Sequence, residues 1–429
     1  MAGSATATSN AKAPSAAFVQ CRPVRITSAS LVTPLGRSAI ETAAALLRSE
    51  TTARRVRRLS AGLAPDFRID PTELARATAS VPLQRADAPD RAIALASAAI
   101  DGLHAPVAGA AMFLGASKGA IASLVALAQG DRTRPEAQRA AVLGPHGWLA
   151  AALRERFALG DATSVVAACA SGLVALDRAA RAISVGAIDR ALVVSVEASL
   201  CPLFVEAYSA MGALASVTPI KAHVAKPLDA QRTGFTLCEC AAALLLERDG
   251  KGDDAGCAGS AGSLTRSSAL ALTGTLLGTA VATEPFDIVR SAPAFGAIER
   301  VARSLLASRQ DQQPAPLALL QPHATGTIDN DERELSALAR ALGPAAIETP
   351  VYANKGALGH GMGASGLVSV ALSLALAKLH ARPPMPWLDE PIDTPFPLSR
   401  EGGSLKAGDH MALAAGFGGH VAAALYRPA

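Results

Sequence analysis

The sequence predicts an α/β protein made of two related halves that share one core. Apolar runs typical of buried strands are followed by longer stretches with helical spacing, as at residues 164–168 and 170–183. The pentapeptide Ala-Ser-Gly-Leu-Val occurs at 170–174 and again at 364–368, and each copy opens an apolar helix followed by a candidate strand. Half of the 429 residues are hydrophobic and only 3% are aromatic, so we expect a large core of Ala, Val and Leu.

The first half begins with a predicted buried strand at residues 110–114. The glycine-flanked turn at 115–119 follows it, but this turn lacks the spacing of a P-loop or a dinucleotide fingerprint, so we interpret it as structural. Residues 164–168 form the next predicted strand, and Cys169 stands between this strand and the helix at 170–183. Unpaired N–H groups and the helix dipole at such a junction favour a thiolate.

The second half is predicted to place two histidines just past strand ends. A strand at 317–320 delivers His323, a helix with a polar opening covers 331–342, His360 lies further along the chain, and 411–415 form a late strand. Reactive groups on such loops can converge.

A Gly- and Ser-rich stretch at 250–263 marks the boundary between the halves. We therefore divide the chain into residues 21–262, which carry the candidate nucleophile, and 263–429, which carry both histidines. Residues 1–20 are predicted to be a disordered tail, since they are rich in small and polar residues and contain no apolar signal core.

Charge and cysteine content exclude several classes of protein. The net charge of +4 comes from 40 basic and 36 acidic residues, which is too balanced to indicate binding to nucleic acid or to a membrane. No segment has the continuous apolar length of a membrane span. The six cysteines form no metal-binding motif, and the Cys-x-Cys pair Cys238 and Cys240 is expected to stay reduced, as in a cytoplasmic protein.

Cys169, His323 and His360 each lie in a segment rich in Gly and Ala. A lone cysteine or histidine is usually structural. A thiol together with two imidazoles, however, supplies what is needed to carry an acyl group on sulfur and to run carbanion chemistry on it.

Further motifs occur in order along nearly the whole chain. They are Val24-Arg25-Ile26-Thr27, Val32-Thr33-Pro34-Leu35-Gly36, Pro227-Leu228-Asp229 with Arg232-Thr233-Gly234-Phe235, His323-Ala324-Thr325-Gly326-Thr327 with Asn330-Asp331 and Glu334, Lys355 with Leu358-Gly359-His360 and Gly363-Ala364-Ser365-Gly366, and Gly416-Phe417-Gly418-Gly419. Together with the Cys169 segment they resemble the elongating β-ketoacyl-acyl-carrier-protein synthases of the thiolase superfamily. The resemblance implies a thiolase-like fold with layers α-β-α-β-α.

The resemblance also implies an acyltransferase that performs a decarboxylative Claisen condensation. Cys169 would take an acyl group from the phosphopantetheine arm of an acyl carrier protein, and His323 and His360 would stabilise the enolate formed from malonyl carrier protein. The backbone N–H groups of Cys169 and Phe417 would form the oxyanion hole. The family uses no metal and no other cofactor.

Supporting roles are implied for five residues. Lys355 and Glu334 would form a buried ion pair that fixes the histidine loops. Thr325 and Thr327 would hydrogen-bond the amides of the pantetheine arm. Phe417, among glycines, would be a gate that separates acylation from condensation.

Three departures from the family pattern indicate a specialised member outside primary fatty-acid synthesis. Ala324 replaces a glycine and restricts the backbone after His323. Cys238-Glu239-Cys240 replaces Gly-Glu-Gly, and His420-Val421 replaces Thr-Asn after the gate.

The same residues discriminate between related classes of protein that share this fold. A thiolase needs a second cysteine near the C-terminus, and none follows Cys257. A priming synthase uses Cys, His and Asn, which His360 argues against, and a silent chain-length partner would lack Cys169. The chain is expected to form a homodimer, but it could also be the active half of a heterodimer with such a partner.

The docking site for an acidic carrier protein is weakly marked. An arginine of the family is replaced by Gly212. The remaining candidates are Arg85, Arg91, Arg132, Arg134 and the cluster Arg54, Arg55, Arg57 and Arg58, for which solvated surface charge is the favoured interpretation.

Overall fold

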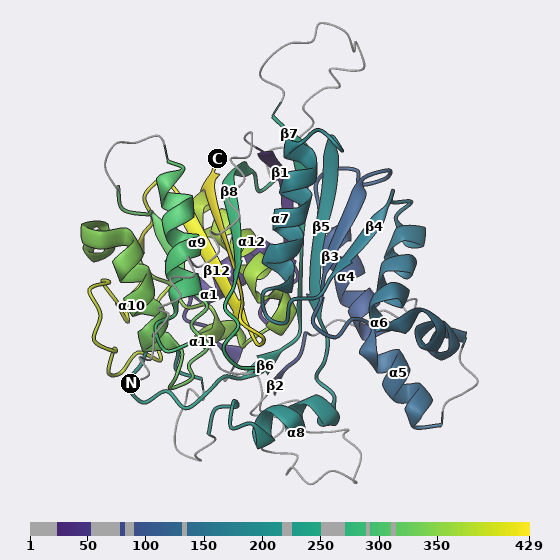
Figure 1. Ribbon diagram of the computed structural model, residues 1–429, viewed down its shortest axis with the longest axis horizontal. Coiled ribbons are helices and arrows are strands. Elements are labelled where there is room, and N and C mark those ends of the chain that lie inside the picture. Colours follow the sequence, from purple (N-terminus) through teal and green to yellow (C-terminus); the bar gives the residue numbers. More distant parts are fainter. Residues whose placement is uncertain are drawn as a thin grey trace, which may run out of the picture.

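The computed structural model describes residues 24–52, 78–81, 90–130, 135–216, 225–249, 271–288, 292–309 and 315–429. The predicted tail at 1–20 and the predicted boundary at 262/263 lie outside these residues. The structure consists of a broad sheet with helices packed on it (Figure 1).

Nine strands form the main sheet in the order β4-β3-β5-β7-β1-β8-β13-β12-β9. They are β1 (Val24–Val32), β3 (Ala111–Gly115), β4 (Ala162–Val165), β5 (Arg190–Glu197), β7 (Cys240–Arg248), β8 (Gly274–Thr283), β9 (Leu319–Gln321), β12 (His410–Gly416) and β13 (His420–Pro428). Two small sheets pair β2 (Thr78–Ala79) with β6 (Leu237–Cys238), and β10 (Ala381–Arg382) with β11 (Gly403–Ser404). Only residues 24–26 of β1 pair with β8, so the main sheet is two half-sheets joined by a short seam.

The helices complete five layers (Figure 1). They are α1 (Ala39–Leu47), α4 (Arg91–Asp101), α5 (Ile121–Ala128), α6 (Pro135–Arg156), α7 (Ser171–Ser184), α8 (Pro202–Ala210), α9 (Gly296–Ala307), α10 (Asp331–Leu342), α11 (Lys355–Leu358) and α12 (Ser365–Lys378), with 3-10 turns at Gly343–Glu348 and Met362–Ala364. Helix α4 packs outside β5 and β7, α9 packs outside β8 and β13, and α7 and α12 lie between the half-sheets. The predicted α-β-α-β-α layering is confirmed.

Strand β5 shows how the layers are held together. Ala191 and Val193 belong to the core that contains α7, whereas Leu192 and Val194 belong to the core that contains α4 and α6. Burial of each such Val or Leu stabilises the fold by about 1.5–3 kcal/mol relative to exposure. Because both faces are covered, the residues from Ala191 to Val194 are all apolar, as expected for a buried sheet.

Helices α7 and α12 confirm the predicted repeat. Both begin with Ser-Gly-Leu-Val, and they contact each other in the central layer. In α7 the acid Asp177 is held by Arg181 and by Thr279, whereas every residue of α12 from Ser365 to Leu376 is buried. Among the described residues, no helix is long and apolar enough to cross a bilayer.

Candidate active site

Cys169 lies in a strained turn between β4 and α7. The predicted strand reaches residue 168, but β4 ends at Val165 and the chain then turns, with Ala168 in the left-handed region at φ 48°. The Ser171 hydroxyl fixes this turn, since its Oγ accepts the N–H of Ala167 at 2.9 Å and donates to the carbonyl of Ala168 at 2.7 Å. Strain of this kind persists only where neighbouring contacts hold the backbone, and it is common at reactive residues.

The Cys169 thiol is protonated at neutral pH, contrary to the expectation of a thiolate. Burial raises the pKa of Cys169 to about 12, and the nearby charges of Lys355 and Lys118 lower it only in part, while the Glu197 charge raises it. The side chain is almost fully enclosed, so the loss of water is the largest cause of this rise in pKa. In the predicted role of nucleophile, Cys169 would therefore have to lose its proton during the reaction.

His323 and His360 converge on Cys169, as predicted. His323 follows β9, and His360 lies between α11 and α12; their ring centroids are 5.3 Å apart. The Cys169 sulfur and one nitrogen of each ring lie within 4.8 Å of one another. Burial, together with the charge of Lys355, holds the pKa of both imidazoles well below 6.5. Each ring is therefore neutral at pH 7 and carries one N–H donor.

This trio has the donor set of a metal site as well as that of an acyl-transfer site. One sulfur and two imidazole nitrogens suit Zn²⁺. The absence of a metal from the working enzyme stays a prediction.

The His360 ring is oriented by a serine that the sequence analysis quoted without assigning it a role. The Nδ1 of His360 lies 2.8 Å from the Oγ of Ser365, at the start of α12. The His360 backbone is tied to Thr236 and Cys238 by hydrogen bonds of 2.6 and 3.1 Å, and the Phe235 ring meets the imidazole edge-on at 5.0 Å between centroids. With Nδ1 occupied by the serine, Nε2 remains for the reactants.

The His323 loop is held by two buried charges through its backbone. The Glu334 carboxylate accepts the N–H groups of His323 and Ala324 at 2.5 and 2.7 Å, and the Lys355 ammonium donates to the carbonyl of His323. The predicted ion pair between Lys355 and Glu334 is wrong, because no nitrogen–oxygen contact within 4 Å joins these two described side chains. Burial raises the pKa of Glu334 to about 7 and lowers that of Lys355. Their positioning roles are proposals.

The substituted residues near the histidines fit at the cost of strain. Ala324 has a φ of 36°, in the region that favours glycine, so the predicted backbone restriction is present. The Cys240 sulfur fills the space beside Gly361, where a Cβ would come within 2.1 Å of it. Cys238 and Cys240 are both buried free thiols, as predicted.

A cavity of about 680 Å³ leads to the three reactive groups. Cys169, His323 and His360 lie at its lining with Thr325 and Thr327, whose hydroxyl oxygens are 2.9 Å apart. Further lining residues are Met211, Gly212, Phe235, Asp329, Arg333, Met362 and Phe417. The polar Thr pair beside the thiol suits the amide groups of a pantetheine arm, a role that stays a prediction.

The end of β12 lies directly against Cys169. A Cβ on Gly416 would come within 2.9 Å of both the Cys169 nitrogen and the Ala167 carbonyl, so only glycine allows this approach. Phe417 follows and packs against the cluster that contains Cys169. The oxyanion-hole and gate roles of Phe417 remain predictions, supported by this adjacency.

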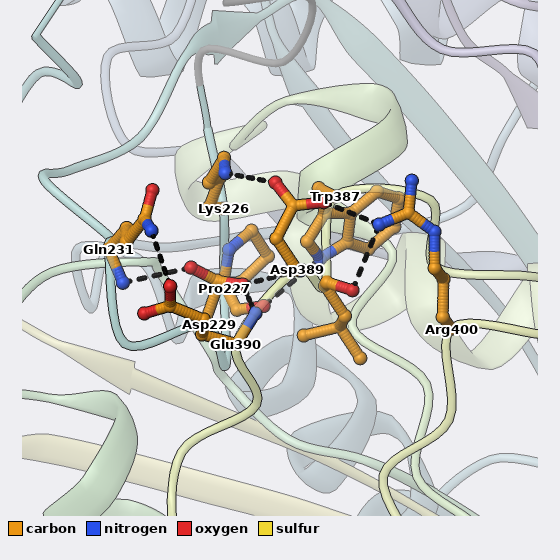
Figure 2. Close-up of polar contacts among 9 residues, drawn as sticks. Lys226, Pro227, Asp229, Gln231, Trp387, Asp389, Glu390 and Arg400 are labelled. Carbon is orange, nitrogen blue, oxygen red and sulfur yellow. Dashed lines mark hydrogen bonds and ion pairs between the residues drawn. The ribbon is translucent and has the colours of Figure 1, made fainter.

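An outer clamp holds the loop that contains Pro227-Leu228-Asp229 (Figure 2). Lys226 Nζ donates to the Asp389 carboxylate at 2.5 Å, and Asp389 also binds Arg400. The Asp229 carboxylate accepts the N–H groups of Asp389 and Glu390 at 2.7 and 2.8 Å. The hydrogen bonds from Lys226 and Arg400 lower the pKa of Asp389 to about 2, so the clamp stays charged at neutral pH.

Asp331 connects this clamp to the histidine loop. Its buried carboxylate accepts the N–H of Leu228 at 2.8 Å and that of Gly326 at 3.0 Å. Arg232 adds hydrogen bonds to the carbonyls of Thr327 and Ile328. The sequence analysis placed Asp331 and Arg232 in motifs but assigned them no structural task.

Of the docking candidates, the structure describes only Arg91. Arg91 is bound bidentately by the buried Glu239, with N–O distances of 3.0 and 2.6 Å, so it is a structural residue. The sequence did not predict this ion pair because it does not show the partner acid, and a docking role of Arg91 stays a prediction. Arg85, Arg132, Arg134 and the cluster Arg54, Arg55, Arg57 and Arg58 lie outside the described residues.

Comparison with solved structures supports the fold. The chain matches a ketosynthase solved in complex with its type II polyketide acyl carrier protein, with a TM-score of 0.75 and 20% identity over 96% of this chain and all of that one. It also matches the ishigamide ketosynthase/chain length factor, with a TM-score of 0.72 and 21% identity over 95% of this chain and 99% of that one.

Sequence relatives share less than two thirds of their own length with this chain. The tetracenomycin polyketide synthase ketoacyl synthase alpha subunit of Streptomyces glaucescens is 29% identical over 64% of this chain and 62% of its own. The 3-oxoacyl-[acyl-carrier-protein] synthase 2 of Mycobacterium leprae is 30% identical over 64% of this chain and 63% of its own.

The family match covers most of the chain and includes every residue of the reactive trio. The N-terminal domain of the β-ketoacyl synthases matches residues 21–251, and their C-terminal domain matches residues 273–386. Cys169 falls in the first match, and His323 and His360 fall in the second. The chain therefore belongs to the β-ketoacyl synthase family.

Proposed function

We propose that the protein condenses a carrier-bound acyl group with malonyl carrier protein through a Cys169 thioester. The observation that carries this proposal is the meeting of one thiol and two neutral imidazoles within 4.8 Å at a cavity lined by two threonine hydroxyls. The departures at Ala324, Cys238 and His420, and a polyketide ketosynthase among the relatives, support a specialised fatty-acid or polyketide pathway.

In the first half-reaction Cys169 Sγ attacks the thioester carbonyl of the acyl arm. A carbon–sulfur bond to Cys169 forms and the bond to the arm's sulfur breaks. The Cys169 proton ends on the departing thiol, which suits a nucleophile whose burial keeps it protonated at rest. The N–H groups of Cys169 and Phe417 would stabilise the tetrahedral oxyanion.

In the second half-reaction malonyl carrier protein loses carbon dioxide. The electron pair of the broken carbon–carbon bond passes into an enolate, whose oxygen accepts N–H bonds from His323 and His360. The enolate carbon then attacks the Cys169 thioester, a new carbon–carbon bond forms, and the Cys169 sulfur leaves and regains a proton. Neutral imidazoles suit this task because each can donate a hydrogen bond to the enolate oxygen without transferring its proton before the enolate carbon attacks.

We further propose that no metal or other cofactor is needed and that the protein works in the cytoplasm as a dimer. Edge strand β4 has residues 162–164 exposed, and Val166 beyond it is 57% exposed, so this edge can pair with a second chain. That chain is a second copy or a chain-length partner. Native mass spectrometry distinguishes the two, and dialysis against a chelator should leave condensation unchanged.

Intact-mass spectrometry tests the central proposal. Incubation with acyl-loaded carrier protein should add one acyl mass to the protein. Cys169→Ala should remove this adduct, and Cys201→Ala, at a half-buried thiol that caps the start of α8, should retain it. Addition of malonyl carrier protein should then discharge the adduct and form a β-ketoacyl product. An adduct that persists in Cys169→Ala, or the lack of any product, would contradict the proposed function.

A further inference from the structure

The three reactive groups also have the geometry of a metal site, which the reaction described above does not use. The Cys169 sulfur and one nitrogen each of His323 and His360 lie within 4.8 Å of one another, and all three residues are buried. Sulfur and imidazole nitrogen are preferred donors for Zn²⁺, and three protein ligands with one open position are typical of reactive zinc sites. Among the described residues, no other group of His, Cys, Asp and Glu side chains has this arrangement.

The spacing of the donors is close to that around a bound zinc ion. Zn–S and Zn–N bonds of about 2.3 and 2.0 Å at a tetrahedral angle place the ligand atoms about 3.5 Å apart. The trio therefore has to close by on the order of 1 Å, which rotation of the side chains supplies. All three residues line the cavity of about 680 Å³, so a fourth ligand has room on that side.

The ring nitrogens of both histidines are arranged as in metal ligands. His360 Nδ1 lies 2.8 Å from Ser365 Oγ, which leaves Nε2 for a metal. Histidine ligands normally hold their second nitrogen in such a hydrogen bond. His323 is only 4% exposed, yet its Nδ1 is buried without a hydrogen-bond partner among the described residues. A buried polar atom of this kind normally has a partner, in the protein or in what the protein binds.

Nearby charges limit how tightly a dication is held. The Lys355 ammonium donates to the carbonyl of His323, and its charge opposes a dication. The Glu334 carboxylate, which accepts the N–H groups of His323 and Ala324, offsets this charge in part. A bound Cys169 sulfur adds one negative charge, since a thiol binds metal as the thiolate. We therefore expect an exchangeable zinc ion and not a permanent one.

We propose that Cys169, His323 and His360 bind Zn²⁺ as an inhibitor that competes with the acyl group for the Cys169 sulfur. Binding replaces the S–H bond of Cys169 by a zinc–sulfur bond and releases one proton to the solvent. The zinc-bound sulfur cannot attack a thioester. Conversely, the sulfur of an acylated Cys169 carries no charge and does not bind the metal. The site stands on its geometry alone, whereas the inhibition rests on the proposed function.

Metal binding is tested on the protein without any substrate. Metal-free protein at neutral pH is titrated with Co²⁺ and then with Zn²⁺, followed by native mass and by absorption. Wild type should bind one ion per chain and show a sulfur-to-cobalt charge-transfer band that Zn²⁺ abolishes and Mg²⁺ does not. Ser365→Ala should lower the affinity by about 10–100-fold, and Ser365→Thr should retain it. Cys201→Ala, at another free thiol, should leave the binding unchanged.

Two further measurements identify the sulfur ligand. Cys169→Ser should lose the charge-transfer band and more affinity than Ser365→Ala does, and wild type alkylated at Cys169 with iodoacetamide should behave in the same way without any substitution. Absence of one-to-one binding would overturn the proposal. A band that persists both in Cys169→Ser and in the alkylated protein would do so too, because the metal would then lie elsewhere.

Inhibition is measured as the rate at which the Cys169 adduct forms, by intact mass. Zn²⁺ should stop acylation of wild type, EDTA should restore it, and enzyme acylated before Zn²⁺ is added should bind no metal. Acylation at the same rate in the zinc-bound protein would refute the competition. If metal-free wild type is not acylated at all, the proposed function fails, and the titration with Co²⁺ alone decides the metal site.

Discussion

Helices α7 and α12 begin with the same four residues, yet their first serines do different work. Ser171 binds backbone only, and it holds the turn that presents Cys169. Ser365 binds the His360 side chain and sets the direction of its ring. Both helices lack a side-chain cap at the preceding alanine, so the local geometry is shared while the contact has changed.

The difference shows which part of each reactive residue needs control. A thiol has one sulfur atom, so fixing the backbone of Cys169 also fixes where that sulfur can lie. An imidazole has two nitrogens, and the donor that faces the reactants depends on the partner of the other nitrogen. The two halves of the fold thus use the same helix start for two tasks. The start of α7 positions the backbone of Cys169, and the start of α12 orients the ring of His360.

The largest expected effect comes from removing the two groups that these helices present. Cys169→Ala should abolish acylation and condensation, whereas His360→Ala should reduce condensation by about a thousandfold or more and leave acylation largely intact, since enolate stabilisation is needed only in the second step. Separate mass measurements of the adduct and the product check this. Loss of acylation in His360→Ala would show that the two helices do not serve separate half-reactions.

Substitutions of Ser171 and Ser365 should affect different properties of the protein, and each effect should be smaller than that of removing Cys169 or His360. Ser365→Ala should slow condensation by about tenfold with acylation near normal, and Ser365→Thr, which keeps the hydroxyl, should recover much of the rate. Ser171→Ala should instead lower the free energy of unfolding by about 1–2 kcal/mol, because the Ala167 N–H loses a buried acceptor. Half-reaction rates and urea unfolding distinguish the two, and identical behaviour of both variants would contradict the comparison.

Glu334 extends the comparison to pH. Burial raises its pKa from 4.5 to about 7, so between these values the folded protein binds more protons than the unfolded chain and Glu334 costs stability as the pH rises. Glu334→Gln should therefore gain stability relative to wild type from pH 4.5 to 7, on the order of 3 kcal/mol at most.

The control for this prediction is Glu299→Gln. Hydrogen bonds from Arg340, and also from Arg303, lower the pKa of Glu299, so its contribution is lost only in acid below this window. Unfolding at several pH values measures both variants. A constant difference between Glu334→Gln and wild type across the window would show that Glu334 stays ionised.

The smallest effect concerns Ala324, the residue after His323, which has a left-handed backbone, whereas Ala170, the residue after Cys169, has a φ of -89°. Ala324→Gly should raise the free energy of unfolding by about 0.5–1 kcal/mol, since relief of the positive φ exceeds the loss of one buried methyl group. Ala339→Gly, inside α10, should lower it by about 1 kcal/mol. Thermal unfolding of both checks this, and a loss of stability in Ala324→Gly would mean that the loop has relaxed around alanine.

Layering, repeat and reactive trio followed from the sequence because each depends on residue type and order. Cys169, His323 and His360 each lie in a motif, and these motifs occur along the chain in the order of the family. The five layers follow from the resemblance to that family, in which each half of the fold is a series of strands and helices. Two expectations failed for different reasons. The thiolate at Cys169 was judged from the helix terminus, without the free energy of removing water from the thiol. The ion pair of Lys355 with Glu334 was implied by the resemblance, and both charged groups bind the backbone of the His323 loop instead.

Other features were hidden because partners lie far apart in the chain. Arg91 looked like a surface cation until Glu239, 148 residues away, was found to bind it. In the sequence, Ser365 could be recognised only as the counterpart of Ser171 in the repeat. A repeat does not show whether a serine hydroxyl binds a histidine ring or the backbone.

The contact of Gly416 with the Cys169 backbone has a consequence for mutational tolerance. Gly416 is not among the residues with positive φ, so its backbone angles alone would accept many side chains. It is the 2.9 Å approach to the Cys169 nitrogen that excludes them. In a saturation library selected for activity, position 416 should accept glycine alone and reject even alanine, because a single methyl group would displace one half of the molecule from the other at the reactive sulfur.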